Sequence, residues 1–147
     1  MASTVEASEE FKVSATIQQC WDFFEDLSKI GSCIPGCESV SRNDDQSANF
    51  KVKLKVGYIS RTFDLKARLK DIIRPNHLSF IGEGNDAQIF GTLDLSPIEA
   101  GSVSVRYKLQ IKAISVTGKT AMGMIGKELV RRQTSEFASC VKSKLQG

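Results

Sequence analysis

The sequence predicts an α+β domain in which a curved antiparallel sheet of about seven strands wraps around one long C-terminal helix. Three observations predict it: consecutive segments with strand alternation, a helical pattern over the last quarter of the chain, and an ordinary globular composition. The chain has 147 residues, of which 41% are hydrophobic and 25% charged. This composition excludes disordered and collagen-like chains. The length is that of a single domain, residues 1–147.

A strand and two short helices are expected to begin the fold. Residues 9–15 alternate between apolar and polar, which predicts a strand. Residues 16–19 read T-x-x-Q, the spacing of a capping box, and an amphipathic helix is predicted over about 17–26. A second helical turn is expected over 27–33, before Pro35 and Gly36, because proline cannot continue a helix.

A run of strands follows. Residues 50–56 and 63–70 alternate on either side of a turn at Gly57 and Tyr58, which predicts a hairpin. Further strands are expected at about 77–84, 88–96 and 103–112. One dry and one wet face on these strands is typical of an antiparallel sheet whose dry face is covered by another element.

The wet face is predicted to be basic. Nine cationic residues fall on outward positions: Lys51, Lys53, Lys55, Lys66, Arg68, Lys70, Arg106, Lys108 and Lys112. Two interpretations stay open, a solvated face and a docking surface for an acidic partner or for anionic lipid headgroups. Aromatic residues do not interleave with these cations, so no nucleic-acid partner is expected.

The last segment has a helical period. From about 119 to 145, apolar residues form one stripe on a helix that would be roughly 40 Å long. This helix is expected to cover the sheet, and a twisted sheet around a single helix leaves an apolar cavity for a small ligand. The predicted cavity walls are Phe63, Leu65, Phe80, Phe90, Tyr107, Met122, Ile125 and Leu129.

Three glycines, Gly118, Gly123 and Gly126, weaken the start of this helix. Each glycine there costs about 1 kcal/mol relative to alanine. Two explanations are open. The glycines form a gate that opens the cavity, or they allow close packing of the helix on the sheet.

Several motifs occur in order along the chain. They are W-D-F-F at 21–24 with C-I-P-G-C-E-S-V at 33–40, K-V-G at 55–57 with Phe63, G-E-G at 82–84 with Gly91, T-G-K-x-A at 117–121 with Gly126, and Phe137. Together they resemble the family of the carbon monoxide dehydrogenase G subunit (CoxG), in the START-like (SRPBCC), helix-grip superfamily. The resemblance implies a seven-stranded antiparallel sheet around the long helix. Thr117 replaces a usual glycine, and the chain stops after the helix, where many members continue into a membrane-spanning tail.

The resemblance also implies a function. It indicates a START-like domain that binds a quinone- or lipid-like apolar molecule and serves as an accessory protein of a molybdenum hydroxylase of the carbon monoxide dehydrogenase type. No pair of acidic residues has a catalytic spacing, so no enzymatic activity is expected. The expected location is the cytoplasm, with peripheral docking at the inner membrane face through the basic sheet surface.

Two other functions stay open. A cyclase- or hydrolase-type enzyme would need a polar set in the same cavity, drawn from His77, Glu83, Tyr107 and Glu128. A protein-interaction module would have a filled core. Apolar cavity walls favour the ligand carrier over both.

Other motifs are weak. Residues 113–120 resemble a Walker A loop with its first glycine replaced, but a phosphate loop requires a parallel βαβ unit. His77 has no carboxylate partner that the sequence identifies, and Cys33 and Cys37 lack two further zinc ligands. No catalytic, metal or cofactor site is therefore expected.

The four cysteines are expected to be free thiols. The first ten residues lack the apolar segment of a secretory signal, which indicates a reducing compartment. No paired spacing requires a disulfide. We therefore expect thiols at Cys20, Cys33, Cys37 and Cys140.

Overall fold

The computed structural model describes residues 4–56 and 59–146, with side-chain surroundings at all of these positions except 56, 59, 117, 118, 121, 122, 124 and 125. Within this part of the chain, seven antiparallel strands form one sheet and three helices accompany it. The elements are β1 (Thr4–Val13), α1 (Ile17–Glu25), α2 (Leu27–Gly31), β2 (Cys37–Arg42), β3 (Ser47–Val56), β4 (Ile59–Ile73), β5 (His77–Glu83), β6 (Ala87–Glu99), β7 (Ser102–Ala113) and α3 (Val116–Gln146).

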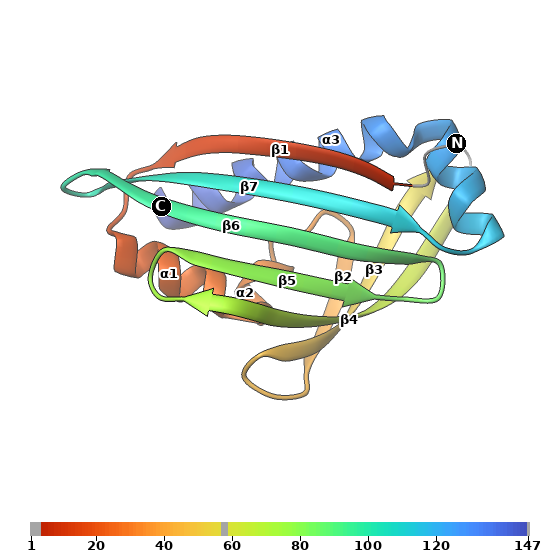
Figure 1. Ribbon diagram of the computed structural model, residues 1–147, viewed down its shortest axis with the longest axis horizontal. Coiled ribbons are helices and arrows are strands. Elements are labelled where there is room, and N and C mark those ends of the chain that lie inside the picture. The colour runs from red at the N-terminus through yellow and green to blue at the C-terminus, as the bar shows by residue number, and fades with distance from the viewer. Residues whose placement is uncertain (1–3, 57–58, 147) are drawn as a thin grey trace.

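The sheet has the strand order β1-β7-β6-β5-β4-β3-β2, and each strand pairs antiparallel with its neighbour. Figure 1 shows β2 and β3 running steeply across the view while β1, β7, β6 and β5 run nearly horizontally, so the sheet is strongly twisted. The helix α3 lies behind β1 and β7 and contacts both strands. This is the expected helix-grip arrangement, with one face of the sheet turned to the helix.

The two short helices form where the sequence predicts them. The hydroxyl of Thr16 accepts a hydrogen bond from the Gln19 amide at 3.1 Å, and the Gln19 side chain accepts one from the Thr16 amide at 2.8 Å. This confirms the capping box. Asp26 caps α2 by accepting hydrogen bonds from the amides of Ser28 and Lys29.

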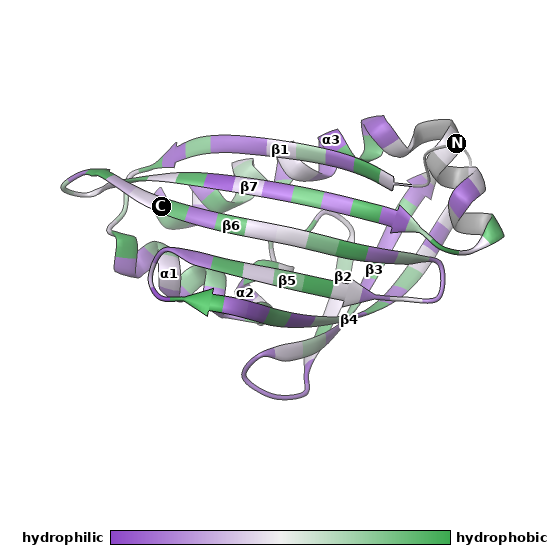
Figure 2. Cartoon of the chain, viewed as in Figure 1, coloured by the Kyte–Doolittle hydropathy of each residue, from purple (hydrophilic) through white to green (hydrophobic). Residues whose placement is uncertain are grey.

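The core lies between the inner face of the sheet, the C-terminal half of α3 and the two short helices. Its largest fully buried side chains include Trp21 and Phe24 of α1, which share one cluster with Leu78 and Leu93 of the sheet. Figure 2 shows hydrophobic and hydrophilic residues alternating along β7, where the hydrophobic ones are buried. The alternation therefore places the apolar side chains inside, as predicted.

Two strands differ most from the sequence prediction. The first strand runs from Thr4 to Val13 instead of from 9 to 15, because pairing with β7 extends it through polar residues such as Glu6 and Ser8. The strand β2 is not predicted by alternation. Most of its side chains are exposed and only Cys37 and Val40 are half-buried, so it carries little apolar signal.

The nine predicted cations do not form one patch. Those on β3 and β4 lie on neighbouring strands, whereas β5 and β6 separate them from β7. On β7, Arg106 pairs with Glu10 at 3.4 Å and Lys108 with Glu6 at 3.2 Å. The expectation of one basic sheet face is therefore wrong for Arg106 and Lys108, because the adjacent β1 supplies carboxylates that the alternation within each strand did not reveal.

Candidate functional site

An apolar cavity of about 190 Å³ lies between the inner face of the sheet and α3. Strands β3 to β7 form one wall, α1, α2 and the segment after α2 close one side, and α3 contributes Gly126, Leu129, Gln133 and Phe137. An engineered apolar cavity of about 150 Å³ holds a benzene molecule. This cavity therefore accommodates a group of about the size of a substituted ring.

Most of the predicted wall residues surround this space. Phe63, Leu65, Phe80, Tyr107 and Leu129 all line it. The side chains of Met122 and Ile125 lie outside the described positions. That these residues bind a ligand stays a prediction.

Phe90 does not line the cavity, so its predicted position is wrong. It is 39% exposed and faces a groove on the outer side of the sheet, beside Thr92 and Asp94. On β6 the inward residues are Ile89 and Leu93, and successive side chains of a strand point to opposite faces. Both sets of alternating positions carry a large apolar residue here, so the sequence pattern left the direction of Phe90 ambiguous.

Three aromatic rings form a row along the cavity wall. The ring of Tyr107 lies 4.7 Å from that of Phe137 and 6.4 Å from that of Phe80, measured between centroids. Phe80 sits directly across from Gly91, where an added Cβ would lie only 2.1 Å from its ring. Gly91 therefore lets the Phe80 ring lie over β6, a role that sequence reasoning did not assign to this glycine.

Few polar groups reach this wall. Among the described lining residues, the polar side chains are those of Asp86, Tyr107 and Gln133, and none is Lys, Arg or His. Gln133 donates a long hydrogen bond of 3.5 Å to the carbonyl of Pro35. Burial raises the pKa of Tyr107 well above its usual range, so its hydroxyl stays neutral at physiological pH.

Asp86 joins the sheet to the start of α3. Its carboxylate accepts a hydrogen bond from the Ser115 hydroxyl at 2.7 Å and pairs with Arg61 at 3.1 Å. Its main-chain carbonyl accepts a hydrogen bond from the amide of Ile114 at 2.9 Å. The Ser115 hydroxyl, and after it Arg61, hold the pKa of Asp86 below its usual range against the opposing effect of burial. Asp86 is therefore ionised, and it anchors the chain where it leaves β7.

The three predicted gate glycines have different surroundings. Gly126 is buried and lines the cavity. Gly123 is exposed, and a Cβ added there would meet nothing within 4 Å. The surroundings of Gly118 lie outside the described positions. Close packing of the helix on the sheet therefore does not explain Gly123. Gly126, in contrast, forms part of the cavity wall.

The polar set considered for an enzyme is not assembled in the cavity. Of its members only Tyr107 is among the described residues that line this space. Glu83 and Glu128 are exposed, and His77 lies on the outer face of the sheet.

On that outer face the structure gives His77 a carboxylate that the sequence did not reveal. His77 Nδ1 lies 2.7 Å from Asp94 Oδ1, and His77 Nε2 lies 3.3 Å from Ser79 Oγ. This connectivity is that of a Ser-His-Asp triad. However, Ser79 is only 3% exposed and pairs with Lys70 on one side and Thr92 on the other, inside the sheet ladder. An oxyanion hole needs free amides beside an accessible nucleophile, so this cluster is structural.

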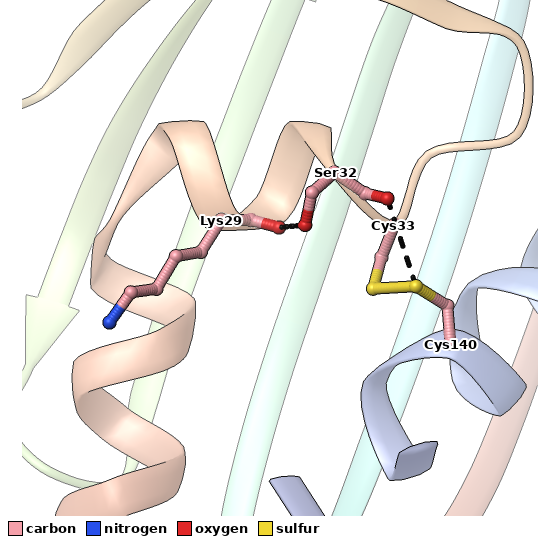
Figure 3. The surroundings of a disulfide bond; sticks show 4 residues. All are labelled: Lys29, Ser32, Cys33 and Cys140. Atoms are coloured by element: carbon pink, nitrogen blue, oxygen red, sulfur yellow. Dashed lines mark hydrogen bonds between the residues drawn. A yellow bond between two sulfur atoms is a disulfide. The ribbon is translucent and has the colours of Figure 1, made fainter. Parts of the chain in front are cut away.

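The expectation of four free thiols is wrong for two of them. Cys33, just after α2, forms a disulfide with Cys140 of α3 across 107 residues of sequence, with 5.4 Å between the Cα atoms. Figure 3 shows this bond joining the loop to the helix beside Ser32, whose hydroxyl donates to the Lys29 carbonyl. Cys20 and Cys37 are free, and burial raises the pKa of Cys20 to about 11. The pairing follows from tertiary packing, which spacing along the chain could not show.

Comparison with known proteins agrees with this geometry. The family model of the carbon monoxide dehydrogenase G subunit (CoxG) matches residues 10–146. The chain belongs to the CoxG family. A search of curated protein sequences found no match. In the part of this CoxG-family chain that is described, no helix is long and apolar enough to cross a membrane.

Solved structures show that the CoxG-family chain has a START-like fold. A conserved protein from Geobacillus kaustophilus superposes with a TM-score of 0.79 at 19% identity, covering 95% of this chain and 94% of that one. The ZhuI aromatase/cyclase from Streptomyces sp. R1128 has a TM-score of 0.72 at 12% identity, with 97% and 93% covered. A START superfamily protein from Mycobacterium smegmatis has a TM-score of 0.70 at 10% identity, with 95% and 96% covered.

Proposed function

We propose that this protein binds a quinone- or lipid-like apolar molecule in the cavity between the sheet and α3. The observation that carries the proposal is an apolar space of about 190 Å³ inside a domain of this size. Protein interiors are normally close-packed, with few voids larger than a water molecule. A space of this volume with almost wholly apolar walls is suited to an apolar guest.

The cavity limits the shape of this guest. Its volume accommodates a ring or a short chain segment, so a longer tail would extend through the cavity mouth. The described lining carries one anionic group, Asp86, and no cation. A neutral ligand is favoured, because an anion would enter a low-dielectric site with no positive partner.

We also propose that the protein serves as an accessory to a molybdenum hydroxylase of the carbon monoxide dehydrogenase type. Membership of the CoxG family supports this role. The β3–β4 patch, defined as Lys51, Lys53, Lys55, Lys66 and Arg68, supports docking to an acidic partner or to an anionic membrane surface. None of these five forms an ion pair with a described residue. Asp64 lies opposite Lys51 and Glu83 opposite Lys66 in the sheet, so the patch keeps a positive charge because its cations outnumber these carboxylates.

An enzymatic function in the cavity has less support. A structural neighbour is named an aromatase/cyclase, but at 12% identity this likeness concerns the fold alone. Among the described lining residues, the cavity brings Tyr107 together with no general base apart from the ion-paired Asp86. A binding role therefore accounts for the geometry with fewer assumptions.

Native mass spectrometry of the purified protein tests the binding proposal. Leu129→Trp places a large side chain in the cavity wall, and Val116→Trp adds the same side chain at a position that is 83% exposed. We expect the wild type and Val116→Trp to bind a short-chain ubiquinone analogue, and Leu129→Trp to lose it. Equal binding by all three proteins would place the ligand elsewhere and contradict the proposal.

A further inference from the structure

One hydroxyl inside the cavity has no partner among the described residues. Tyr107 projects from the inner face of β7, is 6% exposed and lines the cavity. Its hydroxyl makes no hydrogen bond within residues 4–56 and 59–146. In that same part of the chain, every fully enclosed side-chain oxygen or nitrogen has a partner. The Tyr107 hydroxyl is therefore not fully enclosed, and the open space it reaches is the cavity.

The surroundings of this hydroxyl differ from those of other buried hydroxyls. Thr134, which is 1% exposed, donates its hydroxyl hydrogen bond to the carbonyl of Arg131 at 2.8 Å. Tyr107 is held in place by ring contacts with Phe137 and Phe80. Because the Tyr107 hydroxyl is open to the cavity, its hydrogen-bond partner is a molecule inside that cavity, either water or a ligand.

We propose that Tyr107 selects the ligand: it exchanges a hydrogen bond with a hydroxyl or carbonyl oxygen of a neutral, ring-bearing apolar molecule. This inference rests on the proposed function and names the chemistry of its ligand. A neutral phenol both donates and accepts, so either type of oxygen satisfies it. The flanking rings favour a flat ligand, because aromatic groups pack well in offset or tilted arrangements.

The charges around the cavity exclude acidic ligands. Asp86 is the one charged group among the described lining residues, and it is paired with Arg61 on its own side. A carboxylate entering the cavity would meet this negative charge and no cation of the described lining. The inference thus predicts an order of affinity: oxygen-bearing neutral rings first, plain hydrocarbon rings second, and aromatic carboxylates last.

Binding of 1-naphthol, naphthalene and 1-naphthoate at neutral pH tests this order. We expect the wild type to bind 1-naphthol roughly three- to tenfold more tightly than naphthalene, the range given by one net hydrogen bond. Tyr107→Phe keeps the ring and loses the oxygen, so it should lose the preference for 1-naphthol over naphthalene. Thr134→Val removes a buried hydroxyl that does not line the cavity and should keep the wild-type preference.

Each outcome distinguishes the two proposals. Equal binding of 1-naphthol and naphthalene by the wild type overturns the role of Tyr107 and leaves the proposed function standing, as does tightest binding of 1-naphthoate. If Tyr107→Phe still binds 1-naphthol more tightly than naphthalene by the wild-type factor, the role of Tyr107 is also overturned. Failure of the wild type to bind any of the three compounds while it binds the short-chain ubiquinone analogue overturns the role of Tyr107 alone, and failure to bind the analogue as well overturns both proposals. The order of the three affinities in the wild type tests the role of Tyr107 by itself. It therefore decides the question even if thermal unfolding shows that Tyr107→Phe is misfolded.

Discussion

The two halves of α3 meet the sheet in different ways. From Val130 to Val141 the helix buries an apolar stripe, and Cys140 joins it covalently to Cys33. Before Gly126 the described side chains are exposed, among them Val116 at 83%. Among the described residues, α3 thus contributes buried side chains over 130–141, called the anchored half, and exposed ones over 116–126 before Gly126, called the covering half. The cavity-lining residues of α3 run from Gly126 to Phe137 and so span the boundary between these two parts of the helix.

The difference predicts where a ligand enters. The anchored half is held by burial and a disulfide, so opening it would expose core. The covering half is held where it begins by Asp86 and Ser115, and it contains the three glycines. Local opening occurs where few apolar contacts must break. We therefore expect ligand exchange through the N-terminal half of α3.

Removing the disulfide should have the largest effect on stability. Replacing Cys33 and Cys140 by serine should lower the free energy of unfolding by about 4 kcal/mol, because the bond closes a loop of 107 residues. The expected fall in melting temperature is roughly 10 °C. Thermal unfolding with and without reductant measures it, with Cys37→Ser as the control. A wild-type melting temperature that reductant leaves unchanged would show that the anchored half does not depend on this bond.

A glycine on the opposite wall tests the aromatic row that reaches the anchored half. Gly91→Ala would drive a methyl group into the Phe80 ring, where an added Cβ lies 2.1 Å away. We expect a loss of about 2 kcal/mol of stability from overpacking, together with weaker binding of apolar ligands. Gly82→Ala is the matched control for the unfolding measurement, since its Cβ would meet Ile89 at an ordinary 3.5 Å; Gly82 also lines the cavity, so ligand binding is not compared between the two variants. Equal unfolding curves for the two variants would argue against the packing of Phe80 on β6.

The attachment of the covering half can be loosened at Asp86. Asp86→Asn removes the charge that holds Ser115 and Arg61, so ligand exchange should become roughly two- to tenfold faster. Stopped-flow displacement of a bound probe measures this rate. Asp64→Asn, an exposed carboxylate on β4, should leave it unchanged.

The contacts of Asp86 also predict that the rate of ligand exchange depends on pH. The folded-state pKa of Asp86 is lowered, so its contribution is present above the ordinary aspartate value of about 3.9 and is lost as pH falls through the lower folded value. Exchange by the wild type should therefore accelerate below about pH 4, whereas Asp86→Asn should show no such rise. A parallel acceleration in both proteins would assign it to other groups.

The smallest effect is expected at Gly123. Alanine fits there without contact, so Gly123→Ala should raise stability by about 0.5–1 kcal/mol and slow ligand exchange. Gly126 is unsuitable for this test because it lines the cavity. A variant that is more stable yet exchanges its ligand at the wild-type rate would show that this segment is not a gate.

Local sequence signals predicted most of the fold. The capping box, the alternation on β3, β4 and β7 and the long helical stripe each reflect interactions within one element or hairpin. The features that were missed depend on contacts between distant segments. Asp94 beside His77, Cys140 beside Cys33 and Glu10 beside Arg106 become neighbours only through the strand order and the docking of α3.

For the cavity too, local patterns were predictive and contacts between distant segments were missed. Phe63, Leu65 and Tyr107 belong to strands with clear alternation, and their inward direction was predicted correctly. Phe90 was misplaced because Ile89 beside it is equally apolar. The unpaired hydroxyl of Tyr107 could not be foreseen, since it depends on which groups fail to reach it in three dimensions.

Hydrogen exchange with and without 1-naphthol, followed by mass spectrometry, locates both the ligand and its path of entry. We expect an apolar ligand to lie between the sheet and α3 and to enter under the N-terminal half of the helix. In the free protein, residues 116–126 should exchange much faster than residues 130–141. Saturation with 1-naphthol should slow exchange more in 116–126 than in 130–141, because the second segment lines the cavity through Gln133 and Phe137 but is already held by the core and the disulfide. Equal exchange of the two halves in the free protein, or protection confined to the outer face of the sheet, would contradict the account.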